Sequence, residues 1–247
     1  MSPDPSRAPV PGAALARQLS RLSGGAPLPP APSPADLLGD WLDWQRAVAL
    51  SRALDLAPPE PAPAVGDPGD DPSPAEQSRA VRAALEAAIT DDGRDWTRPL
   101  RPRPGDDGTA AAAGAAAVRR HCQGLQRDMH AATGRLRGEL RERLEHRGGD
   151  AARLAAVDAT LEGLLAPREH ALLEPVVPAL AARFEQLHAR EGKHGPVDGD
   201  RPDASVGTAW RDHFRAEARQ LLLAELDLRF HPIEALLAAL RTSRTDA

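Results

Sequence analysis

The sequence predicts an all-α protein with a long antiparallel helical hairpin, additional packed helices and Pro-rich disordered linkers. The first reason is composition, because the chain is rich in Ala, Leu and Arg but has only four Trp, three Phe and no Tyr. Ala, Leu and Arg favour helices, whereas sheets favour β-branched and aromatic side chains. The second reason is that apolar residues recur three and four positions apart in several segments. The third is that clusters of proline, which interrupts regular structure, separate these segments.

The first two helices are expected within residues 12–22 and 33–54. Residues 12–22 (GAALARQLSRL) place three leucines on one face. In the second segment, Ser33 and Pro34 form a typical start signal, an N-cap followed by proline in the first turn. Its apolar positions fall on one stripe, which consists of Leu37, Trp41, Trp44 and Val48. Each of these two helices is therefore expected to be amphipathic.

A proline-rich acidic linker follows and indicates how the chain is divided. Residues 57–75 hold prolines and acids without apolar periodicity, which is typical of a flexible linker. The start signal is repeated at Ser73, and a third helix is expected to run to about Thr90. The predicted organisation is short N-terminal helices in 1–56, the linker in 57–75 and a helical hairpin or bundle domain in 76–247.

The long helix expected from Thr109 to Arg147 has a heptad-like seam, which is typical of a coiled coil. The seam consists of Val118, Cys122, Leu125, Met129, Ala132 and Leu136. Glycines within this helix weaken it by roughly 1 kcal/mol each relative to alanine, so it needs a packing partner. These glycines are Gly114, Gly124, Gly134 and Gly138.

Gly148 and Gly149 are expected to end the long helix and to form the turn of the hairpin. The second helix of the hairpin is expected from Ala151 to about Arg190, with kinks or breaks at its three prolines, which are Pro167, Pro175 and Pro178. Thr208 is the expected cap of a further helix that Pro232 should end, and residues 233–240 should form a terminal helix.

Charge and cysteine content exclude several classes of protein. The formal net charge of −5 argues against a general binder of nucleic acids or anionic membranes. Cys122 is the single cysteine, so an internal disulfide is impossible and a cysteine-based metal site is not expected. The N-terminal residues lack the apolar core of a signal peptide, and no run of 18 uncharged apolar residues is present. We therefore expect a cytoplasmic protein that does not insert into a membrane.

The sequence offers no constellation of catalytic or cofactor-binding residues. It contains neither the H-E-x-x-H pattern of zinc proteases nor the G-x-S-x-G pattern of hydrolases, and it has no phosphate-binding glycine loop. Cys122 lies on the apolar seam, where a cysteine is typically a small buried hydrophobe. The sequence therefore predicts a protein that is not an enzyme and that uses no metal and no cofactor.

An alternative function is suggested by the basic character of one segment. Residues 109–155 hold nine Arg and five acids, and the arginines from Arg119 to Arg147 could contact nucleic-acid phosphates. However, Glu139, Glu142 and Glu145 alternate with these arginines and can form ion pairs along the helix. A salt-bridged, solvated helix face is therefore the competing interpretation.

Two groups of residues are candidates for binding a protein partner. Trp41 and Trp44 are candidate anchors, because Trp is enriched at binding hot spots, although simple packing in the core is the favoured interpretation of both. The second group consists of charged residues placed among leucines, namely Asp158, Glu225, Asp227 and Arg229. Buried charges must be paired, so these residues are expected either to form an internal ion pair or to recognise a partner.

Four blocks of the sequence resemble an uncharacterised proteobacterial family, domain of unknown function 3348. The blocks are GAALARQLSRL (12–22), DWLDWQRAVALSRAL (40–54), VDATLEGLLAPREHALLEPVVPALAARFEQL (157–187) and LLLAELDLRFHPIEALLAAL (221–240). The family has no assigned activity. Genes of this family often lie near genes for proton channels of the MotA/TolQ/ExbB type and for OmpA-like envelope proteins. The resemblance therefore implies an accessory role in an envelope-spanning, ion-driven assembly, with one of these membrane proteins as partner.

The functional hypothesis from the sequence is a non-enzymatic helical interaction or adaptor protein. It is motivated by extensive apolar stripes on helices without accompanying site chemistry. The alternative is a nucleic-acid-associated regulator that uses the arginine-rich helix.

Overall fold

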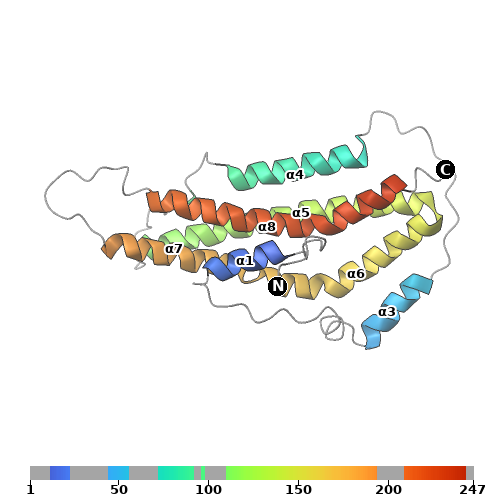
Figure 1. Cartoon of the computed structure of the whole chain (residues 1–247), viewed down its shortest axis with the longest axis horizontal. Helices are drawn as coiled ribbons and strands as arrows, with labels where there is room; N and C mark the ends of the chain where they lie inside the picture. Colours follow the sequence, from blue (N-terminus) through green and yellow to red (C-terminus); the bar gives the residue numbers. More distant parts are fainter. Residues whose placement is uncertain are drawn as a thin grey trace, which may run out of the picture. The chain divides into compact units, whose positions relative to one another are not determined.

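The computed structural model describes residues 12–22, 44–55, 72–91, 96–97, 110–193 and 209–242. Within these ranges the regular structure is helical and contains no strand, so the predicted all-α class is confirmed (Figure 1). The helices are α1 (Ala13–Leu22), α3 (Trp44–Asp55), α4 (Pro74–Thr90), α5 (Ala110–Arg147), α6 (Gly149–Leu173), α7 (Val176–Lys193) and α8 (Ala209–Thr242). No helix in the described ranges is both long enough and apolar enough to cross a membrane.

The chain forms two compact units, and the first contains α1, α5 up to Asp128, α7 and α8 up to Leu228. Aromatic residues make up much of its core: the rings of Phe184 and Phe214 lie 5.4 Å apart, and Trp210 packs 5.3 Å from Phe184. Gly114 on α5 lies directly against the Phe184 ring, where a side chain would not fit. Helix α1 packs on α7 and buries Leu15 completely.

The second unit contains α3, most of α4, α5 from Met129, α6 and α8 from Arg229. Its core comes from leucines on one side of α5 and from apolar residues of α8. The fully or almost fully buried members are Leu136, Leu140, Leu144, Ile233 and Leu236. The seam predicted from the sequence is the buried face of α5 at all of its positions except the half-buried Ala132, and Leu140 and Leu144 extend this face.

Helix α4 begins where the sequence predicts, with a reciprocal capping box. The Glu76 backbone N–H donates to Ser73 Oγ at 3.3 Å, and the Ser73 backbone N–H donates to a Glu76 carboxylate oxygen at 2.9 Å. Pro74 occupies the first helical position, where a missing N–H leaves no hydrogen bond unmade. The Ser73 N–H···Glu76 hydrogen bond lowers the pKa of the Glu76 carboxyl group, and this supports the charge of Glu76 near the positive end of the helix.

The hairpin turn between α5 and α6 is formed by the two glycines that the sequence singled out. Gly148 and Gly149 have φ angles of +68° and +54°, a left-handed conformation that glycine adopts without strain. The Gly148 N–H closes the end of α5 by donating to the Glu145 carbonyl at 3.0 Å. The two helices then run antiparallel (Figure 1), and Arg137 and Arg141 on α5 each contact both Asp158 and Glu162 on α6.

The prolines affect the helices differently. The chain breaks at residues 174–175, so the break expected at Pro175 is confirmed, whereas α6 continues through Pro167. The expectation for Pro232 was wrong. Pro232 does not end the last helix, because α8 continues through it to Thr242. Phe230 and Ile233 lie on either side of Pro232, and both are buried. The free energy gained by burying them outweighs the loss of the hydrogen bond that proline cannot donate.

Several predictions concern residues that the structure does not describe. The helix expected from Ser33 is described from Trp44 onwards, so Leu37 and Trp41 lie outside the described residues, as does linker segment 57–71. The predicted division into 1–56, 57–75 and 76–247 stays a prediction.

Candidate functional site

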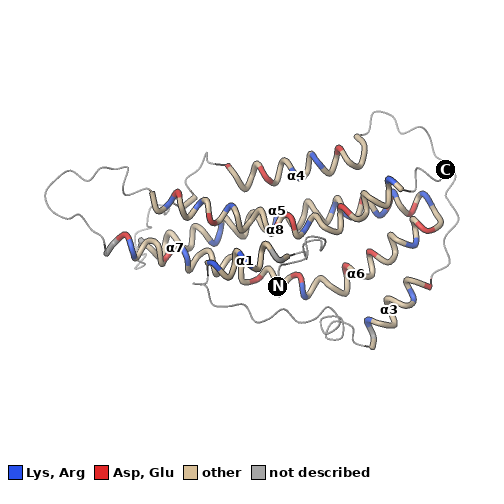
Figure 2. Tube along the Cα trace, viewed as in Figure 1, with Lys and Arg blue, Asp and Glu red and all other residues tan. Residues whose placement is uncertain are grey.

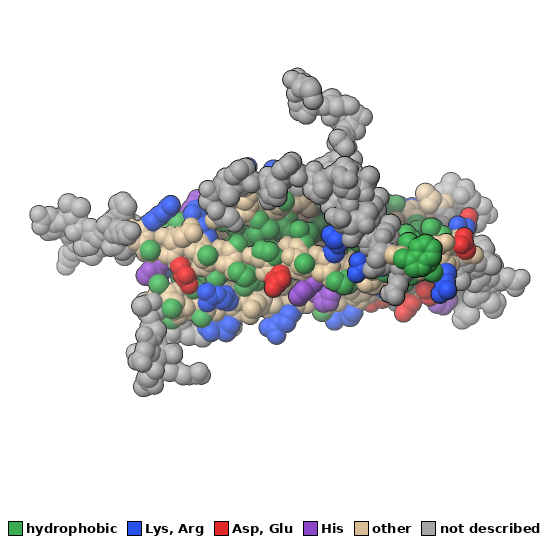
Figure 3. Space-filling model, turned by 90° about the horizontal axis from the view of Figure 1, so that it is seen from below, with side chains coloured by type: hydrophobic (Ala, Val, Ile, Leu, Met, Phe, Trp, Pro, Cys, Tyr) green, Lys and Arg blue, Asp and Glu red, His purple; other side chains and the backbone are tan. Residues whose placement is uncertain are grey.

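The exposed large hydrophobic side chains of the described residues all lie on two helices of the second unit. They are Trp44 and Leu54 on α3, and Leu154, Leu165 and Leu172 on α6. Trp44 is 82% exposed, whereas large aromatic rings are usually well covered in a folded protein. Figure 3 shows an open patch of hydrophobic side chains on this side of the molecule, with charged residues beside it. Large apolar side chains exposed on two packed helices are candidates for a binding site.

Four leucines form a stripe along α6, which we name the leucine stripe: Leu154, Leu161, Leu165 and Leu172. Their spacings of seven, four and seven residues place all four on one face of the helix, within about 40° of one another. Leu154, Leu165 and Leu172 are 39%, 39% and 46% exposed, and Leu161 is half-buried. The same spacing is used by coiled-coil helices to insert side chains into a facing helix.

Helix α6 is thinly covered for an apolar helix of 25 residues. It fully buries only Ala152, Ala155 and Leu173. Within residues 163–172, only Leu164 and Glu169 are not exposed. The leucine stripe therefore continues into a half of the helix that the described residues leave open.

Helix α3 packs on α6 within the same unit. Among its described side chains only Ala53 is buried, and Trp44 and Leu54 point into solvent. An isolated helix of 12 residues has only marginal stability in water, so α3 depends on its packing against α6. Together, Trp44, Leu54 and the leucine stripe form the surface that we name the docking surface.

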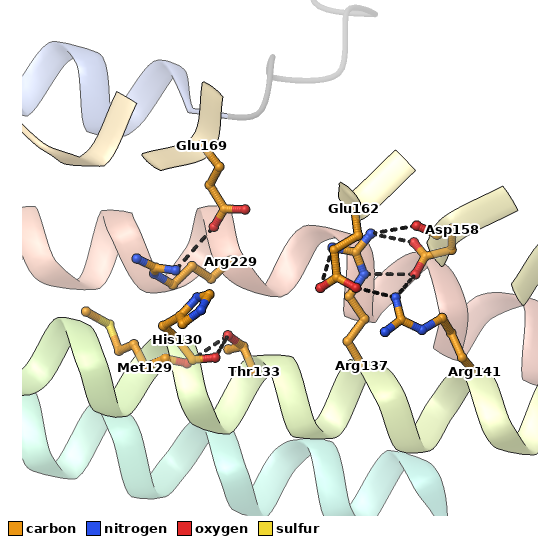
Figure 4. Close-up of polar contacts among 9 residues, drawn as sticks. All are labelled: Met129, His130, Thr133, Arg137, Arg141, Asp158, Glu162, Glu169 and Arg229. Atoms are coloured by element: carbon orange, nitrogen blue, oxygen red, sulfur yellow. Dashed lines mark hydrogen bonds and ion pairs between the residues drawn. The ribbon is translucent and has the colours of Figure 1, made fainter. Parts of the chain in front are cut away.

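On the side facing α5, the acids of α6 are paired with arginines (Figure 4). Arg137 donates two hydrogen bonds to the Asp158 carboxylate, at 2.8 and 2.7 Å. Arg141 pairs with the Asp158 carboxylate at 3.3 Å and also with Glu162. Burial by itself would lower the pKa of Arg141, but hydrogen bonds and charges from Glu162 and Asp158 outweigh burial and raise it. Arg141 therefore keeps its charge in this contact.

A second ion pair connects α6 to α8. Arg229 approaches Glu169 at 3.2 Å, and the Arg229 side chain is only 9% exposed (Figure 4). The carboxylates of Asp158, Glu162 and Glu169 thus all meet arginines from neighbouring helices. These contacts fix the rotation of α6 about its own axis, and this in turn sets where the leucine stripe points.

The residues proposed from the sequence lie in different surroundings. Trp44 belongs to the docking surface, and Asp158 and Arg229 belong to the ion pairs that orient α6. Glu225 lies in the first unit, fully buried, and accepts a hydrogen bond from the Gln126 side-chain amide at 2.9 Å. Asp227 is exposed on α8. Glu225 and Asp227 thus belong to the first unit, and Asp158 and Arg229 belong to the second.

Sequence reasoning did not identify Glu162 and Glu169 as partners of the arginines. The sequence does contain a signal for the pairing on α6. Arg137 and Glu162 are nearly the same number of residues from the Gly148–Gly149 turn, and so are Arg141 and Asp158. In an antiparallel hairpin, such residues face each other. The docking surface was harder to find, because the sequence alone does not say which apolar stripe stays uncovered.

Most arginines of the predicted basic stripe on α5 are engaged within the protein. Besides Arg137 and Arg141, Arg143 donates to the Gln77 side chain at 3.2 Å, and Arg147 donates to the Leu240 carbonyl at 2.6 Å. Arg119 forms an exposed ion pair with Glu185 at 3.4 Å. Glu139, Glu142 and Glu145 lie among these arginines on α5, and Figure 2 shows basic and acidic residues mixed along the helices of the described residues. The helix therefore presents mixed charge rather than a continuous basic face.

The single cysteine is held in a form without nucleophilic character. Cys122 is completely buried, and burial together with the nearby Glu225 charge raises its pKa to about 12. Because the thiolate is the nucleophile, a thiol with this pKa is unreactive at neutral pH. Its chain neighbour His121 instead stacks on the Trp96 ring at 4.5 Å, and burial lowers the His121 pKa.

A polar cleft of about 400 Å³ lies between the start of α4 and the end of α5. Its lining residues are Pro72, Gln77, Glu139, Glu142, Arg143 and His146. Gln77 hydrogen-bonds both Glu139 and Arg143, so these polar groups satisfy one another. Across the described part of the chain, no three His, Cys, Asp or Glu side chains are grouped to hold a metal ion. The docking surface is therefore the stronger candidate for a functional site, and its chemistry suits a protein partner. The cleft is the weaker candidate.

The resemblance found in the sequence is borne out by comparison with known proteins. No curated protein and no solved structure matches this chain. A family whose description reads "Protein of unknown function (DUF3348)" matches residues 1–242. Since this match covers nearly the whole sequence, the chain belongs to that family.

Proposed function

We propose that this protein is a non-enzymatic interaction or adaptor protein that binds a protein partner through its docking surface. The observation that carries the proposal is the exposure of Trp44 and four leucines on two neighbouring helices. Aromatic and large aliphatic side chains concentrate in the centre of protein interfaces, where they supply most of the binding energy. Apolar side chains that stay exposed favour aggregation, and a bound partner would cover them.

The orientation of α6 supports this function. The ion pairs of Asp158 and Glu162 with α5, and of Glu169 with α8, hold α6 at a defined rotation. An interface is stronger when its anchors are ordered before binding, because less conformational entropy is lost. The leucine stripe is thus displayed by a helix that is fixed on one side and open on the other.

The alternative, a regulator bound to nucleic acid, has less support. Four of the eight arginines between Arg119 and Arg147 are directed to partners within the second unit, at Asp158, Glu162, Gln77 and the Leu240 carbonyl. Arginines that are already hydrogen-bonded would have to exchange these contacts for phosphate. A phosphate-binding surface normally gathers several uncommitted cations on one face.

The first partners to test are those that the family resemblance implies, a MotA/TolQ/ExbB-like channel or an OmpA-like envelope protein. The proposal then places the protein on the cytoplasmic side of an envelope-spanning, ion-driven assembly, as an accessory component that does not itself insert into the membrane.

The test is co-purification of the tagged chain from its own host in mild detergent, followed by mass spectrometry. The wild type is compared with a Trp44→Ala, Leu165→Ala, Leu172→Ala variant and with an Arg120→Gln, Arg135→Gln control. The control changes two exposed residues of α5 outside the docking surface. We expect the wild type and the control to retain a membrane-protein partner that the triple variant loses.

Either of two results would contradict the proposal. One is recovery of the same partners with all three proteins, since the docking surface would then have no part in binding. The other is recovery of nucleic acid alone, with binding that weakens as salt is raised and that the Arg120→Gln, Arg135→Gln variant reduces. That second result would favour the alternative function.

A further inference from the structure

The buried face of α3 is narrow and consists mainly of small side chains. Ala53, 4% exposed, is the one described side chain of α3 that is buried. Ala49 and Arg46 lie four and seven residues earlier, so they are on the same face of the helix, and both are half-buried. Arg46 also makes an interaction within the protein. Helix α3 packs on α6, so this face is the one that the contact between the two helices covers.

The large apolar side chains of α3 contribute little burial. Trp44 lies nine residues before Ala53, on the opposite side of the helix, and is 82% exposed. Leu54 is exposed, and Val48 and Leu50 are only half-buried. Burial of large apolar side chains supplies much of the free energy that holds a helix in place, so the contact of α3 with α6 is a weak one.

The long helices of the second unit are held much more firmly. Leu136, Leu140 and Leu144 of α5, like Ile233 and Leu236 of α8, are at most 2% exposed. Figure 1 draws α3 at the edge of this unit, beside α6. Local opening of a protein begins with elements that bury few apolar side chains. Helix α3 should therefore separate from α6 at a much lower free energy than the unit unfolds.

The chain on either side of α3 is long enough to allow this separation. Residues 23–43, twenty-one in number, lie between α1 and α3, and residues 56–73, eighteen in number, lie between α3 and α4. An extended chain spans about 3.3 Å per residue, so each connection can reach roughly 60 Å. Helix α3 can therefore leave α6 without requiring α1 or α4 to move.

Release of α3 would enlarge the surface that α6 offers to a partner. Figure 1 draws α3 beside the part of α6 that follows the α5–α6 turn. Within residues 151–162, the exposed side chains are only those of Leu154 and Ala159, whereas most side chains of residues 163–172 are exposed. Without α3, the better covered first half of α6 would gain exposed surface continuous with the leucine stripe. The spacing of that stripe suits the side chains of another helix.

Building on the proposed function, we infer that α3 is a releasable helix, which occupies the first half of α6 in the free protein and detaches as a unit when a helix of the protein partner takes its place. The partner helix then contacts the leucine stripe together with the surface that α3 has left. Trp44 lies on the side of α3 opposite Ala53, so its exposure does not depend on whether α3 is docked.

Native-state hydrogen exchange of the full chain, followed by mass spectrometry, tests for release without any partner. We expect the amides of residues 46–55 to exchange at least about a hundredfold faster than those of residues 133–144 on α5, but at least about tenfold slower than in an unstructured peptide. Low concentrations of urea should change the exchange of α3 little, because its release exposes far less surface than unfolding does. Protection equal to that of α5, or no protection at all, would overturn the inference.

Two substitutions on α3 provide a matched comparison. Ala53→Glu places a charge in the contact with α6 and should make α3 exchange about tenfold faster, while the exchange of α5 stays the same. Ser51→Glu adds the same side chain at an exposed position and should have little effect. Equal effects of the two substitutions on α3 would refute the contact through Ala53 on which the inference depends.

Partner binding tests whether release of α3 accompanies recognition. In the co-purification described above, Ala53→Glu should raise recovery of the partner about threefold or more, because α3 no longer has to be released first. Ser51→Glu should leave recovery unchanged. Unchanged or reduced recovery with Ala53→Glu would overturn the inference, since docked α3 would then be compatible with binding or required for it. The proposed function fails separately, when co-purified partners do not depend on the docking surface, whereas the exchange of α3 is measured without a partner.

Discussion

Arg137 on α5 donates two parallel hydrogen bonds to the Asp158 carboxylate on α6. The Nη2–Oδ1 distance is 2.7 Å and the Nε–Oδ2 distance is 2.8 Å. Both side chains are only 13% exposed. Such a forked pair restricts distance and rotation together, because the planar guanidinium must align with the carboxylate plane. The pair therefore sets the register of the hairpin, and the register decides which face of α6 carries the exposed leucines.

Breaking this pair should destabilise the protein strongly. Asp158→Ala leaves Arg137 partly buried without its main partner, so we expect the free energy of unfolding to fall by roughly 2–4 kcal/mol. Urea unfolding followed by circular dichroism at 222 nm measures the change. As a control, Arg119→Gln removes an ion pair whose side chains are about half exposed, and it should cost less than about 1 kcal/mol. Equal effects of the two substitutions would show that the buried pair has no special role.

Gly114 should tolerate no larger residue. An added Cβ would lie 2.5 and 2.6 Å from two atoms of the Phe184 ring, which is itself 1% exposed and has no room to move. Gly114→Ala should therefore lower the free energy of unfolding by about 1–3 kcal/mol, despite the better helix propensity of alanine. Thermal unfolding of the purified variant measures this effect.

Gly134 provides the matched control on the same helix. A Cβ at this position meets nothing within 4 Å. Gly134→Ala should raise the free energy of unfolding by about 0.5–1 kcal/mol, because alanine loses less backbone entropy in a helix. If both alanine variants were stabilised, the close approach of Gly114 to Phe184 would be refuted.

Cys122 should be inert toward thiol reagents in the folded protein. With its pKa raised to about 12, the thiolate fraction at pH 8 is about a thousandfold below that of an unfolded cysteine. Reaction with a chromogenic disulfide such as DTNB should therefore be slow until urea unfolds the chain, and then rapid. Rapid labelling of the folded protein at pH 8 would contradict the buried position.

His121 should make the protein more sensitive to acid. Burial lowers the folded-state pKa of His121 below its unfolded value, although Asp91 opposes the shift. The unfolded chain therefore takes up a proton first, so the stabilisation by neutral His121 is present above about pH 6.5 and is lost as pH falls through the folded-state pKa. Between pH 7.5 and 5, the urea midpoint of the wild type should fall further than that of His121→Gln. Equal falls would assign the acid sensitivity to other groups.

The sequence by itself determined the all-α class and most helix boundaries of the described residues. The local signals were strong and consistent: Ser73 and Glu76 formed the expected capping box, and Gly148 and Gly149 formed the expected turn. These features depend on interactions within a few residues, and such interactions are encoded locally.

Tertiary packing overrode local preference at the prolines. Pro232 is a helix breaker in isolation, yet α8 continues through it because Phe230 and Ile233 on either side are buried. The burial of large apolar side chains offsets the missing hydrogen bond, and this burial depends on residues distant in sequence.

The candidate site could be predicted only in part. The sequence singled out Trp44 and Asp158, but it could not show that Trp44 is exposed or that Asp158 holds Arg137. Nothing in the sequence distinguishes Leu165 from the other leucines of its helix, whereas the fold leaves it exposed. A periodic stripe specifies that a helix has an apolar side; only the arrangement of the other helices decides whether that side is covered.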